Sequence, residues 1–113
     1  MQTLKNLPED RAASLSGLID TAPDQVISMA LSRSPDVQIS LFSFADGETI
    51  SAESYPGDTL YLLLEGSARI SFGDHWAALA PGEALAVAAG RPHAIGGGKA
   101  FKMLQITFQN EDS

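Results

Sequence analysis

The sequence contains no cysteine, so it forms no disulfides or thiolate metal sites and carries no cysteine nucleophile. Basic residues are also few: seven Lys and Arg stand against fourteen Asp and Glu, a net charge of −7. Because nucleic acids and anionic membranes are bound through basic surfaces, this balance argues against both as partners. No apolar run reaches the roughly 18 residues of a membrane-spanning helix, and the N-terminus has no signal-like apolar segment. We expect a soluble, cytoplasmic protein.

What the sequence does contain is a series of short apolar segments separated by Gly- and Pro-containing turns. The 113 residues are 44% hydrophobic, which suits one domain with one core. Residues 37–45 alternate between two faces, as half-buried strands do. The predicted strands are residues 25–33, 37–45, 59–66, 67–72, 75–80, 83–88, 93–95 and 100–109. Short strands at this spacing predict an all-β fold, an antiparallel barrel or sandwich.

The N-terminal segment differs from the rest of the chain. Residues 1–24 lack the strand pattern and are interpreted as an arm, while residues 25–113 form the barrel domain. A short helix is predicted within residues 8–19, because Pro-Glu-Asp suits a first helical turn and apolar residues then recur on one face. Leu4 and Leu7 precede it and fit none of the predicted strands.

Two glycines nineteen positions apart frame a segment with the spacing of a known motif. In that motif a Gly is followed after five residues by His-x-His, then by a Glu and finally by a second Gly. Gly47 and Gly66 occupy its two ends, and the sequence thereby resembles the cupin superfamily. The metal ligands of the motif do not carry over: Glu53 and Tyr55 stand in the two His positions, and Thr59 stands in the Glu position.

A second cupin motif is matched further along the chain. It reads Gly, five residues, Pro, one residue, Gly, two residues, His, three residues, Asn. Gly82, Gly90 and His93 occupy its glycines and its histidine, whereas Ala88 and Gly97 replace the Pro and the Asn. His93 is therefore the one usual ligand that remains of four.

The resemblance covers residues 26–108 and implies a small single-domain cupin of the cupin 2 type, an RmlC-like jelly-roll barrel. In the family, the residues at the positions of Glu53 and Tyr55 project from one strand into the barrel, and His93 lies opposite. The predicted pocket residues are Glu53, Tyr55, Thr59, His93 and Gln105. The leading interpretation is a protein that binds a small molecule in its barrel without the usual His-rich metal site, and with no tightly bound metal ion.

Two alternatives stay open, so the sequence does not decide whether the protein is an enzyme. Carboxylate and imidazole groups bind divalent metals, so Glu53 and His93 are candidate ligands of a metal-dependent (Zn, Mn, Fe or Ni) enzyme. Alternatively, the same two residues are an acid and a base, with Tyr55 as proton carrier, in a metal-free isomerase or epimerase. The ligand and any catalytic residue are unknown at this level.

Association is also expected. A jelly roll leaves edge strands, small cupins commonly dimerise, and the arm with Leu4 and Leu7 is a natural contact. The sequence therefore predicts a two-fold homodimer. Trp76 follows a Gly-Asp turn and is interpreted as a packed residue of the barrel rather than as an exposed aromatic.

Overall fold

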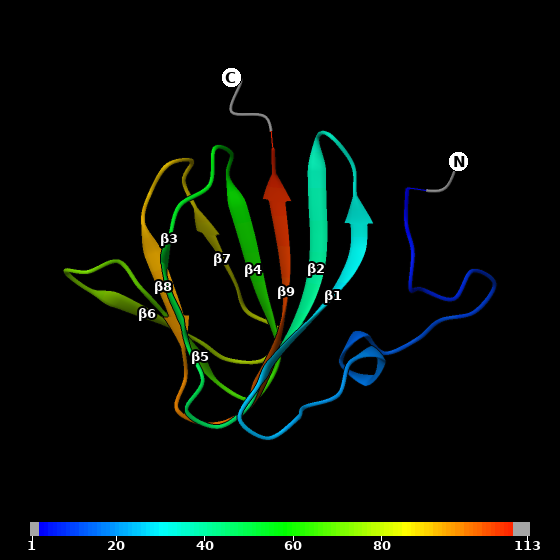
Figure 1. The fold of residues 1–113 in the computed structure, drawn as a ribbon, viewed down its shortest axis with the longest axis horizontal. Helices are drawn as coiled ribbons and strands as arrows, with labels where there is room; N and C mark the ends of the chain where they lie inside the picture. The colour runs from blue at the N-terminus through cyan, green and yellow to red at the C-terminus, as the bar shows by residue number, and fades with distance from the viewer. Residues whose placement is uncertain (1–2, 110–113) are drawn as a thin grey trace.

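The computed structural model describes residues 3–109 and is almost entirely β (Figure 1). Residues 1–2 of the predicted arm and residues 110–113 of the predicted barrel domain lie outside this range. The elements are η1 (Leu15–Leu18, a 3-10 helix), β1 (Val26–Arg33), β2 (Val37–Phe44), β3 (Ile50–Glu53), β4 (Thr59–Glu65), β5 (Ala68–Ser71), β6 (Trp76–Leu79), β7 (Ala84–Val87), β8 (His93–Gly96) and β9 (Phe101–Phe108). Each predicted strand is present, and β3 is added to them. Within residues 3–109, no helix has the length and hydropathy needed to cross a membrane.

The strands form two antiparallel sheets that face each other across a common core (Figure 1). One sheet has the order β1-β2-β9-β4-β7, and the other has the order β3-β8-β5-β6. Several neighbours in the sheets are far apart in sequence: β9 lies between β2 and β4, and β8 lies between β3 and β5. The all-β fold predicted from the turns, and the jelly roll implied by the cupin resemblance, are therefore confirmed.

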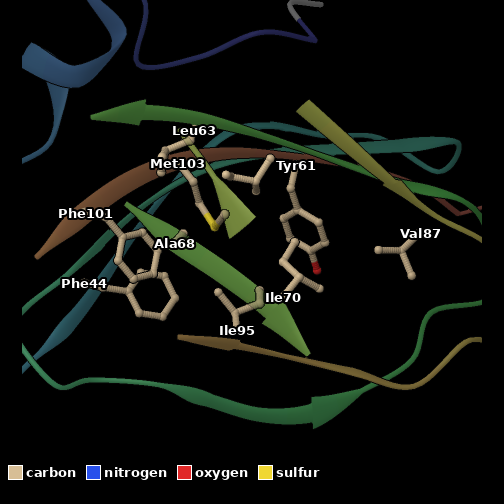
Figure 2. Packing of buried hydrophobic residues seen from close by; sticks show 10 residues of the cluster. Phe44, Tyr61, Leu63, Ala68, Ile70, Val87, Ile95, Phe101 and Met103 are labelled. Carbon is tan, nitrogen blue, oxygen red and sulfur yellow. The ribbon is translucent and has the colours of Figure 1, made fainter. Parts of the chain in front are cut away.

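The core between the sheets follows from the two-residue period of the strands. In β4, the alternate residues Thr59, Tyr61 and Leu63 are buried, and in β9 every second residue beginning with Phe101 is buried. The rings of Phe44 and Phe101 stack with 4.3 Å between their centroids. Figure 2 shows this stack beside Met103, with the Tyr61 ring extending between the sheets further along the barrel. Burial of these large side chains is the main source of stability.

Gly66, the closing glycine of the first motif, meets a strict spatial requirement. Its φ of 85° lies in the left-handed region, and a Cβ there would come within 2.5 Å of the Ala100 carbonyl oxygen. Only glycine satisfies both conditions without strain. The motif glycine thus serves the barrel corner, independently of any metal.

The N-terminal arm corrects one prediction. In place of the helix expected within residues 8–19, the structure has the four-residue η1. Ser16 and Gly17 are poor helix formers, and the Ser14 and Ser16 hydroxyls bond each other at 3.1 Å. The arm instead packs its apolar side chains on the outer face of the five-stranded sheet, so its stability comes from tertiary contacts.

The ends of the arm differ in their contacts. Leu7 is half-buried and packs against the buried cluster that contains Leu31 and Leu41 of the same chain. Leu4 pairs with Ser32 at the edge of β1 but keeps half of its surface exposed. Leu7 lies in none of the strands, as predicted, and packs against the sheet from outside; the homodimer stays a prediction.

The expectation for Trp76 is also wrong. The side chain is 57% exposed and lies on the outer face of the four-stranded sheet. It pairs with Ser71, whose neighbour Ile70 points into the core, so the strand alternation directs Trp76 away from it.

Candidate functional site

The candidate site lies at one end of the barrel interior, where inward-facing side chains change from apolar to polar. Along β4, Leu63 is followed toward the strand start by Tyr61 and Thr59 on the same face. On the neighbouring strand β9, Gln105 pairs with Tyr61 and Thr107 pairs with Thr59. The group, here called the polar cluster, consists of Glu53, Tyr55, Thr59, Tyr61, His93, Gln105 and Thr107.

The centre of the polar cluster is a hydrogen bond between the two sheets. Tyr61 Oη and His93 Nε2 lie 2.7 Å apart, and both side chains are buried. His93 Nδ1 lies 2.9 Å from the Arg91 carbonyl oxygen, which can only accept. In the neutral ring, Nδ1 therefore carries the proton, and Nε2 accepts the hydrogen bond that Tyr61 donates.

Burial fixes the protonation of Tyr61. Removal from water disfavours the phenolate and raises the pKa of Tyr61 far above its ordinary 10.0, and the charges of Tyr55 and Glu53 act in the same direction. Tyr61 therefore remains a hydrogen-bond donor at any physiological pH. As a consequence, it holds the His93 ring in one tautomer.

Glu53 and Tyr55 form the outer part of the polar cluster. The Tyr55 hydroxyl donates to Glu53 Oε2 at 2.8 Å, and the Tyr55 ring lies 5.9 Å from the His93 ring, centroid to centroid. Burial raises the pKa of Tyr55, the nearby Glu53 carboxylate raises it further, and a hydrogen bond with Gln105 opposes both. Glu53 itself is exposed. The pair thus places an exposed carboxylate at the surface of the polar cluster, here called its mouth, with the half-buried Tyr55 phenol next to it.

Tyr55 is positioned by a loop rather than by a strand, which corrects the expectation that it shares a strand with Glu53. Strand β3 ends at Glu53. The Gly90 N–H then donates to the Tyr55 carbonyl at 2.7 Å, the Ala89 N–H donates to Asp58 Oδ1 at 2.9 Å, and the Phe108 N–H donates to the Asp58 carbonyl at 3.0 Å. These bonds attach the Tyr55 loop to the β7–β8 loop and to the end of β9.

The loop is also packed closely at Gly57, between Tyr55 and Asp58. A Cβ at Gly57 would collide with the backbone of Phe108. The mouth of the polar cluster is therefore built from three chain segments in close contact, and only glycine fits at the point where they meet.

One hydroxyl in the polar cluster lacks a partner. Thr59 is 2% exposed, and its Oγ1 has no hydrogen-bond partner among residues 3–109. Its neighbour Thr107, by contrast, accepts from Gln105 Nε2 at 2.9 Å. An unsatisfied buried hydroxyl costs about 1–3 kcal/mol, so buried hydroxyls are usually hydrogen-bonded.

The donors present do not fit a metal ion in this arrangement. No group of three His, Cys, Asp or Glu side chains comes together anywhere in the described part of the chain. Of the two proposed ligands, His93 has its Nε2 lone pair engaged by Tyr61 and its Nδ1 proton engaged by Arg91. Glu53 is exposed and accepts from Tyr55. The two positions that hold histidines in the family's first motif hold Glu53 and Tyr55 here, so His93 is the one imidazole of the polar cluster.

The structure brings the five predicted site residues together, while their role stays a prediction. Glu53 pairs with His93 in the β3–β8 register, and Tyr55 reaches Gln105. The sequence analysis missed Tyr61 and Thr107, which complete the polar cluster. The available signal for Tyr61 was its position two residues after Thr59, because residues two apart on a strand share a face.

Comparison with solved structures gives relatives of high similarity. A cupin superfamily protein from Desulfitobacterium hafniense is 55% identical, with a TM-score of 0.91 over 95% of this chain and 98% of that one. A conserved protein of unknown function from Streptococcus pyogenes is 29% identical, with a TM-score of 0.92 over 99% and 98%. A cupin 2 conserved barrel domain protein from Leptotrichia buccalis is 24% identical, with a TM-score of 0.88. The match covers 97% of this chain and 52% of that one. No family model matches the sequence, and no curated protein matches it.

Proposed function

The chain belongs to the cupin superfamily, and we propose that it is a binding protein that holds a small polar molecule in the polar cluster of its barrel. The proposal does not rest on the fold, because cupin-like barrels serve many functions. It rests on side chains from both sheets that converge at one end of the interior, around the Thr59 hydroxyl, which has no hydrogen-bond partner among the described residues. Such convergence of a few polar groups within an apolar frame is typical of ligand sites.

The Thr59 hydroxyl is the observation that carries this proposal. A ligand atom that bonds Thr59 Oγ1 would remove the penalty of an unsatisfied buried hydroxyl, which favours the bound state. The ligand class follows from the neighbouring charges. Glu53 stands at the mouth, so a carboxylate or phosphate would be repelled there. We therefore expect a neutral molecule with hydroxyl or amide groups.

The contacts of His93 support binding over catalysis. Both ring nitrogens are engaged, and Tyr61 is held in its protonated form. For His93 to accept a proton from a substrate, or to bind a metal through Nε2, the buried bond to Tyr61 would first have to break. The metal-dependent and acid–base alternatives both require that step, and binding at Thr59 does not.

A thermal unfolding screen tests the proposal. Neutral polyols, sugars and small amides would be added to the wild-type protein and to Thr59→Val, which keeps the shape and removes the hydroxyl. A ligand that binds the folded state at one hundred times its Kd stabilises it by about 2.7 kcal/mol, so the unfolding midpoint should rise by several degrees. We expect at least one compound to raise the midpoint of the wild type and to fail with Thr59→Val.

Thr3→Val is the matched control, since it makes the same chemical change at an exposed position of the N-terminal arm, outside the barrel interior. It should respond to the compound as the wild type does. If no compound of these classes shifts the wild type, or if Thr59→Val responds fully, the barrel is not the binding site.

We also propose that the protein is a homodimer. Leu4 and Phe108 are 50% and 46% exposed, and the outward-facing Leu60 and Leu62 of β4 are only half-buried. Covering these side chains with a second copy would remove apolar surface from water, at roughly 25 cal/mol per Å². Sedimentation velocity at micromolar concentration should give about twice the chain mass of 11.9 kDa. A mass of one chain would contradict the proposal.

A further inference from the structure

The outer face of the four-stranded sheet carries a groove that is separate from the polar cluster. The alternation of β5 places Ala68 and Ile70 in the core, so Arg69 and Ser71 point to the opposite side. With Trp76 of β6 they line a cavity of about 570 Å³, which continues across β8 to the residues before and within β3. This volume lies in the range of small-molecule sites, roughly 300–1,000 Å³.

A stacked arginine and tryptophan form one wall of this groove. The Arg69 guanidinium lies over the Trp76 ring, 5.0 Å from its centroid. The two residues are diagonal neighbours on one face, because Ser71 pairs with Trp76 and Arg69 pairs with Ala78. The contact orients the flat guanidinium on a residue that is itself 57% exposed.

Arg69 has no carboxylate partner in the described part of the chain, although the protein has a net charge of −7. Among the described residues that line the groove, Arg69 is the one that carries a charge. An arginine that lines a cavity without an internal counter-ion presents several N–H donors to whatever enters. The groove is therefore suited to one negative charge.

The rest of the groove is small and hydroxylated. Ala94 and Gly96 form its floor, and a Cβ at Gly96 would come within 2.9 Å of the Thr49 methyl carbon, so any side chain there would crowd that side of the groove. Thr49 and Ser51 contribute hydroxyls on one side, opposite Arg69 on the other. The groove thus combines a flat apolar surface, hydrogen-bonding hydroxyls and one cation.

We propose that this groove is a second binding site and that its ligand is a carboxylated sugar. The carboxylate would form a two-pronged hydrogen bond with the Arg69 guanidinium, whose planar fork matches carboxylate geometry. The C–H face of the sugar ring would lie against Ala94 and beside the edge of the Trp76 ring, whose face Arg69 covers, and the sugar hydroxyls would bond those of Thr49 and Ser51. A phosphate ester fits less well, because a single arginine leaves most of a dianion uncompensated.

The tryptophan makes a direct test possible. Trp76 is the only tryptophan of the chain, so tryptophan fluorescence reports on this groove alone. D-glucuronate would be titrated into the wild-type protein, with D-glucose as the neutral counterpart and benzoate as a planar carboxylate without hydroxyls. We expect a saturable change in Trp76 emission with glucuronate, with glucose at least tenfold weaker and benzoate also weaker.

Two arginine variants supply the control. Arg69→Gln should weaken glucuronate binding at least tenfold. Arg91→Gln should leave it unchanged: Arg91 also lies over an aromatic ring, that of Phe72 at 4.1 Å, but does not line the groove. Thr59→Val should also leave it unchanged, so failure of the barrel proposal would not affect this result.

The outcomes that would overturn the proposal are distinct. The absence of any saturable emission change with glucuronate at millimolar concentration would show that the groove does not bind it. Equal losses in Arg69→Gln and Arg91→Gln would show general charge attraction in place of a site. Benzoate binding as tightly as glucuronate would replace the sugar with a planar carboxylate as the ligand class.

Discussion

The two ends of the barrel interior are built from the same strands and differ in chemistry. At one end, Phe44 stacks on Phe101 and packs with Leu63. At the other, Tyr61 and His93 bond across the sheets. Leu63 and Tyr61 are two residues apart on one face of β4, so the boundary between the two ends falls within a single strand. The comparison indicates that the apolar end holds the sheets together, while the polar end contributes less to stability and carries the hydrogen-bonding side chains.

The largest expected effect concerns the apolar end. Phe101→Ala would remove a ring that is 1% exposed and stacked on Phe44, leaving a cavity between the sheets. We expect a loss of about 3–5 kcal/mol in the free energy of unfolding. Urea denaturation followed by circular dichroism would measure it. A loss below about 1 kcal/mol would mean that this end collapses around the cavity and does not carry the core.

An intermediate effect is expected where the two sheets are hydrogen-bonded. Tyr61→Phe keeps the ring but leaves His93 Nε2 without its donor in a buried place. We expect a loss of about 1–3 kcal/mol at neutral pH, measured in the same way. A variant as stable as the wild type would show that His93 finds another donor, and the proposed tautomer would then be wrong.

The same pair predicts the response to alkaline pH. The folded-state pKa of Tyr61 is raised above 10.0, so the unfolded chain releases this proton first as pH rises. Below pH 10 the stabilisation contributed by Tyr61 is fully present. Above pH 10 the free energy of unfolding falls, because the folded state then binds more protons than the unfolded state. Tyr61→Phe should therefore lose stability less steeply than the wild type above about pH 10. Parallel slopes in denaturation experiments would contradict this account.

The smallest effect is expected at two neighbouring threonines, where Thr→Val should change the free energy of unfolding in opposite directions. Thr59 and Thr107 are paired across β4 and β9, but only Thr107 has a hydrogen-bond partner among residues 3–109. Without ligand, Thr59→Val should raise the free energy of unfolding by about 1 kcal/mol, and Thr107→Val should lower it by a similar amount. Equal losses in both variants would indicate that the Thr59 hydroxyl is already satisfied.

Much of the fold could be predicted because the turns are encoded locally. Gly66 and the other motif glycines fix the corners, and the alternation of residues 37–45 indicates a strand. Both faces of that strand are buried, with Phe44 in the core between the sheets and Leu41 under the arm. The short η1 could not be predicted, since packing on the sheet replaced the helical hydrogen bonds of a longer helix. The orientation of Trp76 depends on its register with Ser71, which a tryptophan after a turn does not reveal.

The site could be predicted in part for a similar reason. Motif spacing identified Glu53, Tyr55 and His93, because their positions are tied to the conserved loop lengths of the resemblance. Tyr61 was hidden within the apolar run of residues 60–64, where its hydroxyl looks incidental. Its importance arises from a partner 32 residues away on the other sheet, and single-sequence patterns carry no such distance information.

The attachment of the Tyr55 loop has a consequence for how fast a ligand would bind. Because backbone bonds to Gly90 and Phe108 already hold this loop, little of the mouth has to be ordered when a molecule arrives. The part of the entropic cost of association that comes from ordering this loop would then be small. Capture would be limited by how often a molecule meets the mouth in the right orientation, and differences in affinity between ligands would appear mainly in their dissociation rates.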